Sequence, residues 1–85
     1  MYGWIITRDH LDGKDVTVKG PGGLAPELEA KLDKGEGEAF KIYDDDNELY
    51  YTGKIVGDYD GFEPLDDFCT PDSGCTAIKI DGEFL

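Results

Sequence analysis

The residues with the clearest chemical potential are the carboxylates of one short segment, Gly57 to Phe68, with the sequence GDYDGFEPLDDF. This segment contains no basic side chain, and its acidic residues are Asp58, Asp60, Glu63, Asp66 and Asp67. Clustered carboxylates can bind Ca²⁺, act as acid and base in hydrolysis, or pair with lysine and arginine on another protein. These three uses require different spacings and surroundings, which the remaining sequence helps to distinguish.

The acidic segments do not match the calcium loop of an EF-hand. Loops that begin at Asp44 or Asp58 have Leu49 or Glu63 at the sixth position, where the motif requires glycine. Neither loop has glutamate at the twelfth position. A non-standard Ca²⁺-binding domain stays open as an alternative function, but the sequence predicts no cofactor and no metal ligand.

Zinc and covalent catalysis also lack their signatures. His10 is the one histidine, and the C-x5-C spacing of Cys69 and Cys75 matches no standard zinc pattern. Ser73 is the one serine, and it is not in a G-x-S-x-G elbow. A chain of 85 residues also has little room for a ligand cleft of roughly 300–1,000 Å³. We therefore expect a protein that is not an enzyme.

The excess negative charge is confined to one part of the chain. The formal net charge is −12, and residues 44–72 contribute −9 of it, with ten acidic residues and Lys54. Such a segment repels nucleic acids and anionic membranes, and it attracts cations. Turn-forming aspartates account for a few of these acids but not for the absence of interspersed lysines.

The acidic segment is compatible with a surface that imitates DNA. Alternate side chains along a strand lie ~6.6 Å apart, and two phosphate steps along one DNA strand span ~6.8 Å. Aromatic residues among the carboxylates are typical of protein-binding patches, where they pack against the partner. We predict partner-binding roles, with the tyrosines as packing residues, for Asp44, Asp45, Asp46, Glu48, Tyr50, Asp58, Tyr59, Asp60, Glu63, Asp66 and Asp67. We expect these carboxylates to form one continuous negative face.

Periodicity predicts an α+β fold in which one helix packs on an antiparallel sheet of about four strands, as a single domain over residues 1–85. Leu24, Leu28 and Leu32 recur at helical spacing, with Pro26 in the first turn and Gly35 beyond the end. The runs 39–43 and 49–56 alternate around an Asp/Asn turn and predict a hairpin. Residues 4–7, 16–19 and 76–80 are further strand candidates, and residues 64–68 are a candidate helical turn.

The segment FKIYDDDNELYYTGKIVGDYDGFEPLDDF, together with GCTAIKI and the WII run at Trp4, resembles a family of short acidic bacterial and prophage proteins. That family has no established activity, so the resemblance assigns no functional residue. It implies a mobile-element setting, in which small acidic proteins act as anti-CRISPR or anti-restriction inhibitors.

The leading hypothesis is therefore a phage or prophage inhibitor of the DNA-mimic type, which occupies the basic nucleic-acid-binding surface of a host defence protein. The alternative is an immunity or antitoxin-like protein that neutralises a basic toxin nuclease. The N-terminal MYGWII has no features of a signal peptide, so we expect a cytoplasmic protein with reduced Cys69 and Cys75. The oligomeric state cannot be predicted.

Overall fold

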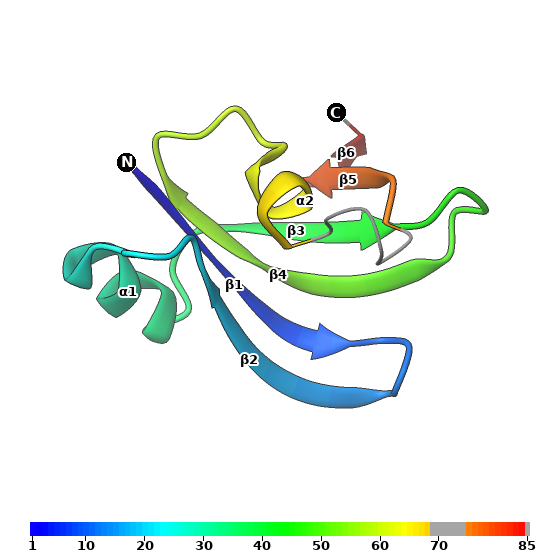
Figure 1. The fold of residues 1–85 in the computed structure, drawn as a ribbon, viewed down its shortest axis with the longest axis horizontal. Helices are drawn as coiled ribbons and strands as arrows, with labels where there is room; N and C mark the ends of the chain where they lie inside the picture. Colours follow the sequence, from blue (N-terminus) through cyan, green and yellow to red (C-terminus); the bar gives the residue numbers. More distant parts are fainter. Residues whose placement is uncertain (69–74, 85) are drawn as a thin grey trace.

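The computed structural model describes residues 1–68 and 75–84 and contains one antiparallel sheet with two short helices (Figure 1). The sheet has six strands in the order β2-β1-β4-β3-β5-β6. In chain order the elements are β1 (Tyr2–Asp9), β2 (Lys14–Gly20), α1 (Pro26–Asp33), β3 (Glu38–Tyr43), β4 (Leu49–Gly57), α2 (Glu63–Phe68), β5 (Ala77–Ile80) and β6 (Glu83–Phe84).

The predicted fold of one helix on about four strands is wrong, because the sheet has six strands and a second helix is present. The strand that sequence reasoning missed is β6, which follows the turn at Asp81 and Gly82. Both turn residues have positive φ, 53° and 85°, as a two-residue hairpin turn of the primed type requires. Asp-Gly is the sequence signal for such a turn, but a strand of only two residues has no periodicity to detect.

One face of the sheet carries the main hydrophobic core. Phe40, Ile42, Ile55 and Ile78 are almost fully buried there, as the alternation of β3, β4 and β5 predicted. The helix α2 lies over this face (Figure 1), where Phe68 makes edge-to-face ring contacts at 5.8 Å from Trp4 and 4.8 Å from Tyr51. The predicted helical turn at 64–68 is confirmed as α2, and its aromatic end anchors the loop after β4 to the core.

Among the described residues, α1 covers one end of the opposite face. The predicted packing of Leu24, Leu28 and Leu32 is confirmed, because these side chains pack with Ile5 and Val56, but Leu24 lies before the helix, which begins at Pro26. The Cβ of any larger residue at Gly3 would collide with the Leu24 side chain, so glycine in β1 lets the segment before α1 approach the sheet closely. The remainder of this face is left open by α1.

The sequence predicted reduced thiols at both cysteines. Cys69 lies outside the described residues. Cys75 is disulfide-bonded, so the prediction of a reduced thiol at this position is wrong. Among residues 1–68 and 75–84, no helix has the length and apolar character that crossing a membrane requires.

Candidate functional site

The structure brings two acidic turns to the same end of the sheet. Because β1 and β4 are antiparallel partners, with Asp9 opposite Tyr51, the β1–β2 turn and the β3–β4 turn lie at the same end of the sheet (Figure 1). We call this region the acidic end; its carboxylates come from Asp9, Asp12, Asp44, Asp45, Asp46 and Glu48. Four of these six were predicted. Asp9 and Asp12 were missed because only the pairing of β1 with β4 brings them to this end of the sheet. The Asp9 Oδ1 atom accepts hydrogen bonds from the backbone N–H groups of Leu11 and Asp12, and Asp12 forms an ion pair with Lys14.

Asp44 organises the β3–β4 turn. Its Oδ1 atom accepts hydrogen bonds from the backbone N–H groups of Asp46 and Glu48, each at 2.8 Å. Asn47 has a φ of 64°, a left-handed conformation that asparagine tolerates. The side chains of Asp45, Asp46 and Glu48 are exposed on this fixed turn. One aspartate of the triplet therefore positions the others.

The tyrosines beside these turns are affected by the local negative potential. Burial raises the pKa of Tyr50, and the charges of Asp44 and Glu48 raise it further. Burial likewise raises the pKa of Tyr51, followed by the charge of Asp9. The Tyr50 and Tyr51 rings meet edge to face at 6.3 Å. Tyr50 is half-buried next to exposed carboxylates, and its role in packing against a partner stays a prediction.

The second group of predicted residues lies beyond the other end of β4, in the loop 58–62 and in α2. Asp58 and Asp60 are exposed and, with Tyr59 and Glu63, they line a shallow hollow of about 300 Å³. Burial alone would raise the pKa of Glu63, but its hydrogen bonds from the backbone N–H groups of Asp60 and Gly61 hold the pKa below its usual value. Glu63 therefore has a structural role, because it fixes the loop that leads into α2.

Tyr59 is held by burial and by Glu38 rather than presented to solvent as a mobile ring. Burial raises the pKa of Tyr59 to about 12, and a hydrogen bond to Glu38 contributes to the shift. The ring also packs against the main core cluster. Tyr59 is therefore part of the scaffold of the loop as well as of its surface.

Asp67 connects α2 to the first strand. Its Oδ2 atom accepts hydrogen bonds from the Tyr2 hydroxyl at 2.7 Å and from the Trp4 indole N–H at 3.1 Å. The bond to Asp67 is the main cause that raises the pKa of Tyr2 to about 12. Asp66, the neighbouring residue in α2, is exposed. Of this adjacent pair, Asp67 stabilises the fold and Asp66 remains a surface charge.

The predicted carboxylates thus form two groups at opposite ends of β4 rather than one continuous face. None of these predicted carboxylates takes part in an ion pair between described residues. Those ion pairs join Arg8 to Asp15, Lys14 to Asp12, and Lys19 to Glu29 and Asp33. The acidic charge of residues 44–67 is therefore not neutralised within the part of the chain that the structure describes.

The carboxylates are too dispersed for a metal site within residues 1–68 and 75–84. No three acidic, histidine or cysteine side chains there are grouped so that they could hold an ion. Comparisons of the chain with protein-family models, with curated proteins and with solved structures find no match.

Proposed function

We propose that this chain is a non-enzymatic acidic binding protein that occupies the basic nucleic-acid-binding surface of a partner protein. The observation that carries the proposal is the acidic end, where Asp45, Asp46 and Glu48 are exposed on a turn fixed by Asp44. Because the backbone of this turn is already ordered, binding lysine or arginine has to order only the side chains, and none of the three takes part in an ion pair between described residues. The half-buried Tyr50 adds a surface on which an arginine side chain can stack.

The separation of the two acidic groups is compatible with the imitation of a nucleic acid. The strand β4 has nine residues, so its ends are ~27 Å apart at the rise of an antiparallel strand. Along one DNA strand this length corresponds to about eight phosphate steps. A basic groove that follows a duplex could contact both groups at once, and two linked contacts bind more tightly than either alone.

The setting that we propose is a phage or prophage inhibitor of a host defence protein, of the anti-CRISPR or anti-restriction type. The resemblance to short acidic prophage proteins supports this setting. An immunity-type protein that neutralises a basic toxin nuclease would use the same surface. The two cases differ in the partner: an inhibitor binds a defence protein of the host, whereas an immunity protein binds a toxin encoded beside it.

The first experiment identifies the partner and tests competition with DNA. Immobilised protein is incubated with bacterial lysate, the resin is washed at rising NaCl, and the retained protein is identified and purified. The purified partner is then loaded with a fluorescent DNA duplex and titrated with the acidic protein. Displacement of the duplex, weakened strongly by salt, supports the proposal. Retention of a partner whose DNA binding is unaffected contradicts it.

Matched charge variants connect the competition to the acidic end. Asp45→Lys combined with Asp46→Lys removes two exposed carboxylates that make no side-chain hydrogen bond in the turn. The control combines Glu27→Lys with Glu36→Lys, two exposed acids of the α1 region, and changes the net charge equally. We expect the first variant to lose displacement and the control to retain it. Equal behaviour of the two would mean that net charge, rather than the acidic end, governs binding.

A cytoplasmic location belongs to this proposal, because the partners considered act on nucleic acids inside the cell. The disulfide at Cys75 argues against that location, since such bonds persist mainly in oxidising compartments. Alkylation of thiols in intact cells before lysis distinguishes a cytoplasmic location from an oxidising compartment. Labelled Cys75 supports the cytoplasm, and protected Cys75 indicates an oxidising compartment and contradicts the proposed location.

A further inference from the structure

Three lysines lie together on the open face of the sheet, which we call the lysine face: Lys41 on β3, Lys54 on β4 and Lys79 on β5. Their neighbours in sequence, such as Phe40 and Ile78, are buried on the opposite face, so the lysines point away from the main core. Lys41 and Lys79 are direct cross-strand partners. Lys54 is the diagonal neighbour of Lys41, because Lys41 pairs with Thr52, two residues before Lys54.

This concentration of positive charge is unusual for a chain with twenty acidic residues. The ion pairs between described residues include none of the three lysines. Like charges directly opposite each other destabilise a sheet, and one glutamate in place of Lys41 or Lys79 would turn the repulsion into attraction. Stability of the fold therefore does not explain why both positions are lysine.

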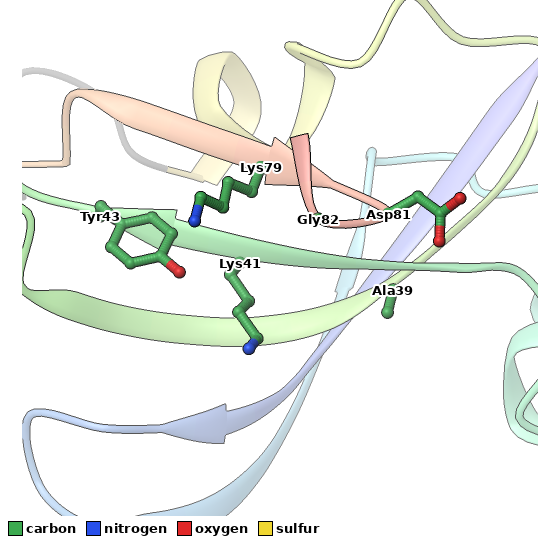
Figure 2. Close-up of a pocket in the computed structure, with 6 residues that line it drawn as sticks. All are labelled: Ala39, Lys41, Tyr43, Lys79, Asp81 and Gly82. Carbon is green, nitrogen blue, oxygen red and sulfur yellow. The ribbon is translucent and has the colours of Figure 1, made fainter. Parts of the chain in front are cut away.

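A hollow of about 320 Å³ lies on the same face, and its lining includes Ala39, Lys41, Tyr43 and Lys79 (Figure 2). The Nζ atom of Lys79 lies 5.5 Å from the centre of the Tyr43 ring and 4.5 Å from that of Phe84. The two rings are 5.3 Å apart. The hollow thus combines ammonium groups with an aromatic wall at one end.

One acidic residue also lines this hollow. Figure 2 shows the carboxylate of Asp81 at the far end from the Tyr43 ring and from the ammonium groups of Lys41 and Lys79. Its position leaves the lysine end of the hollow positive.

We propose that the lysine face binds a small phosphorylated molecule with a planar ring, of the chemical class of a mononucleotide. Lys41 and Lys79 start from cross-strand partner positions, and their flexible side chains can bring both ammonium groups to one phosphate through charge-assisted hydrogen bonds. The Tyr43 ring supplies a surface for stacking, a contact worth ~1–3 kcal/mol per base in nucleic-acid-binding proteins. The volume of about 320 Å³ lies at the lower end of the range for small-molecule pockets.

The charge of the whole chain favours a small ligand over a nucleic-acid polymer. At physiological ionic strength, charges more than ~8 Å apart are largely screened, so a small ligand is little affected by acids outside its immediate surroundings. A polymer would extend from the lysine face towards the acidic turns, and the net charge of −12 would repel it. The lysine face therefore fits a single phosphorylated molecule.

The experiment titrates the isotope-labelled protein with adenosine 5′-monophosphate, inorganic phosphate or adenosine and follows backbone amide resonances. We expect the nucleotide to shift the signals of Lys41, Tyr43 and Lys79, with weaker effects of phosphate and of adenosine alone. We also expect affinity to fall as NaCl is raised, because the contacts are ionic. Equal shifts with adenosine and with the nucleotide, or shifts spread over all lysines, would overturn the proposal.

Variants test the individual contacts and the fold together. The double variant Lys41→Gln with Lys79→Gln is expected to lower nucleotide affinity by at least ~10-fold. The control is Lys34→Gln, at a lysine just after α1, which is expected to leave nucleotide affinity unchanged. Tyr43→Leu is expected to weaken binding of the nucleotide but not of phosphate. An undisturbed amide spectrum shows that each variant is folded, and unchanged affinity of the folded double variant would contradict the proposal.

This inference does not depend on the proposed function. The variant with Asp45→Lys and Asp46→Lys is expected to keep nucleotide binding, because its changes are in the β3–β4 turn, outside the hollow. Loss of partner binding with retained nucleotide binding separates failure of one proposal from failure of the other. Loss of nucleotide binding in this folded variant would contradict the placement of the site.

Discussion

Asp67 is expected to stabilise the fold, whereas its neighbour Asp66 is not. Replacement of Asp67 by alanine removes the acceptor of two hydrogen bonds, from the Tyr2 hydroxyl and from the Trp4 indole N–H. Hydrogen bonds to charged groups contribute ~1.5–3 kcal/mol each when buried, and less where solvent competes, as it does here. We therefore expect the free energy of unfolding to fall by about 2 kcal/mol, which lowers Tm by roughly 8–16 °C in a domain of this size.

The matched control is Asp66→Ala, which removes the same charge from the same helix. Asp66 is exposed and belongs to no ion pair between described residues, so we expect a change within ~0.5 kcal/mol. Thermal unfolding followed by circular dichroism measures both variants. Equal Tm values for the two would refute the assignment of Asp67 as a structural residue.

The pKa of Tyr2 gives a second, independent measure of the same contact. Asp67 raises this pKa to about 12, so in the Asp67→Ala variant we expect it to return towards 10. Between pH 10 and 12 the unfolded chain loses the Tyr2 proton before the folded chain does, so wild-type stability declines as pH rises through this range. Solvent screening limits the effect to about 1 kcal/mol. An NMR titration of the Tyr2 ring that shows the same pKa in both proteins would contradict this reasoning.

Three further predictions concern the scaffold. Gly53→Ala is expected to destabilise the protein by about 3 kcal/mol in urea denaturation, because the new Cβ would collide with the carbonyl oxygen of Ile5 and approach the Phe40 ring at 2.8 Å. The control is Gly22→Ala, at a position where an added Cβ meets nothing. Equal losses of stability in the two variants would contradict the packing at Gly53. Asp44→Ala is expected to cost ~1–2 kcal/mol because it frees two turn N–H groups, whereas Asp45→Ala is expected to be neutral, and a neutral Asp44→Ala would contradict the role of its carboxylate. The pKa of Glu63 is lowered in the folded state, so the stability that the Glu63 carboxylate contributes is lost as pH falls below the ordinary glutamate pKa of about 4.3. The difference in unfolding free energy between wild type and Glu63→Gln is therefore expected to shrink in acid. A difference that stays constant with pH would contradict this role of Glu63.

The strands with strong alternation could be predicted from sequence, and the edges of the sheet could not. Phe40 and Ile42 alternate with Lys41 and Tyr43, and this pattern correctly separated the buried from the open face. The apolar stripe of Leu28 and Leu32 on α1, with Leu24 just before the helix, was predictable for the same reason. In contrast, β2 has few apolar residues and β6 has only two residues, so neither has a periodicity that determines its length.

The roles of individual acids depend on contacts that sequence patterns do not encode. Asp66 and Asp67 are indistinguishable in sequence, yet only Asp67 lies against Tyr2 and Trp4, more than sixty positions earlier in the chain. The acidic end depends on the pairing of β1 with β4, and the lysine face depends on the register of β3, β4 and β5. Charge composition therefore predicted the presence of an acidic surface but not its division into two groups.

The central claim is that the acidic end is the surface that contacts the partner. The most direct test is hydrogen–deuterium exchange of the complex between this protein and the partner captured from lysate. We expect slower exchange in residues 9–12 and 44–50 on binding, with unchanged exchange in α1. Protection confined to α1 or to the lysine face, with residues 44–50 unaffected, would contradict it.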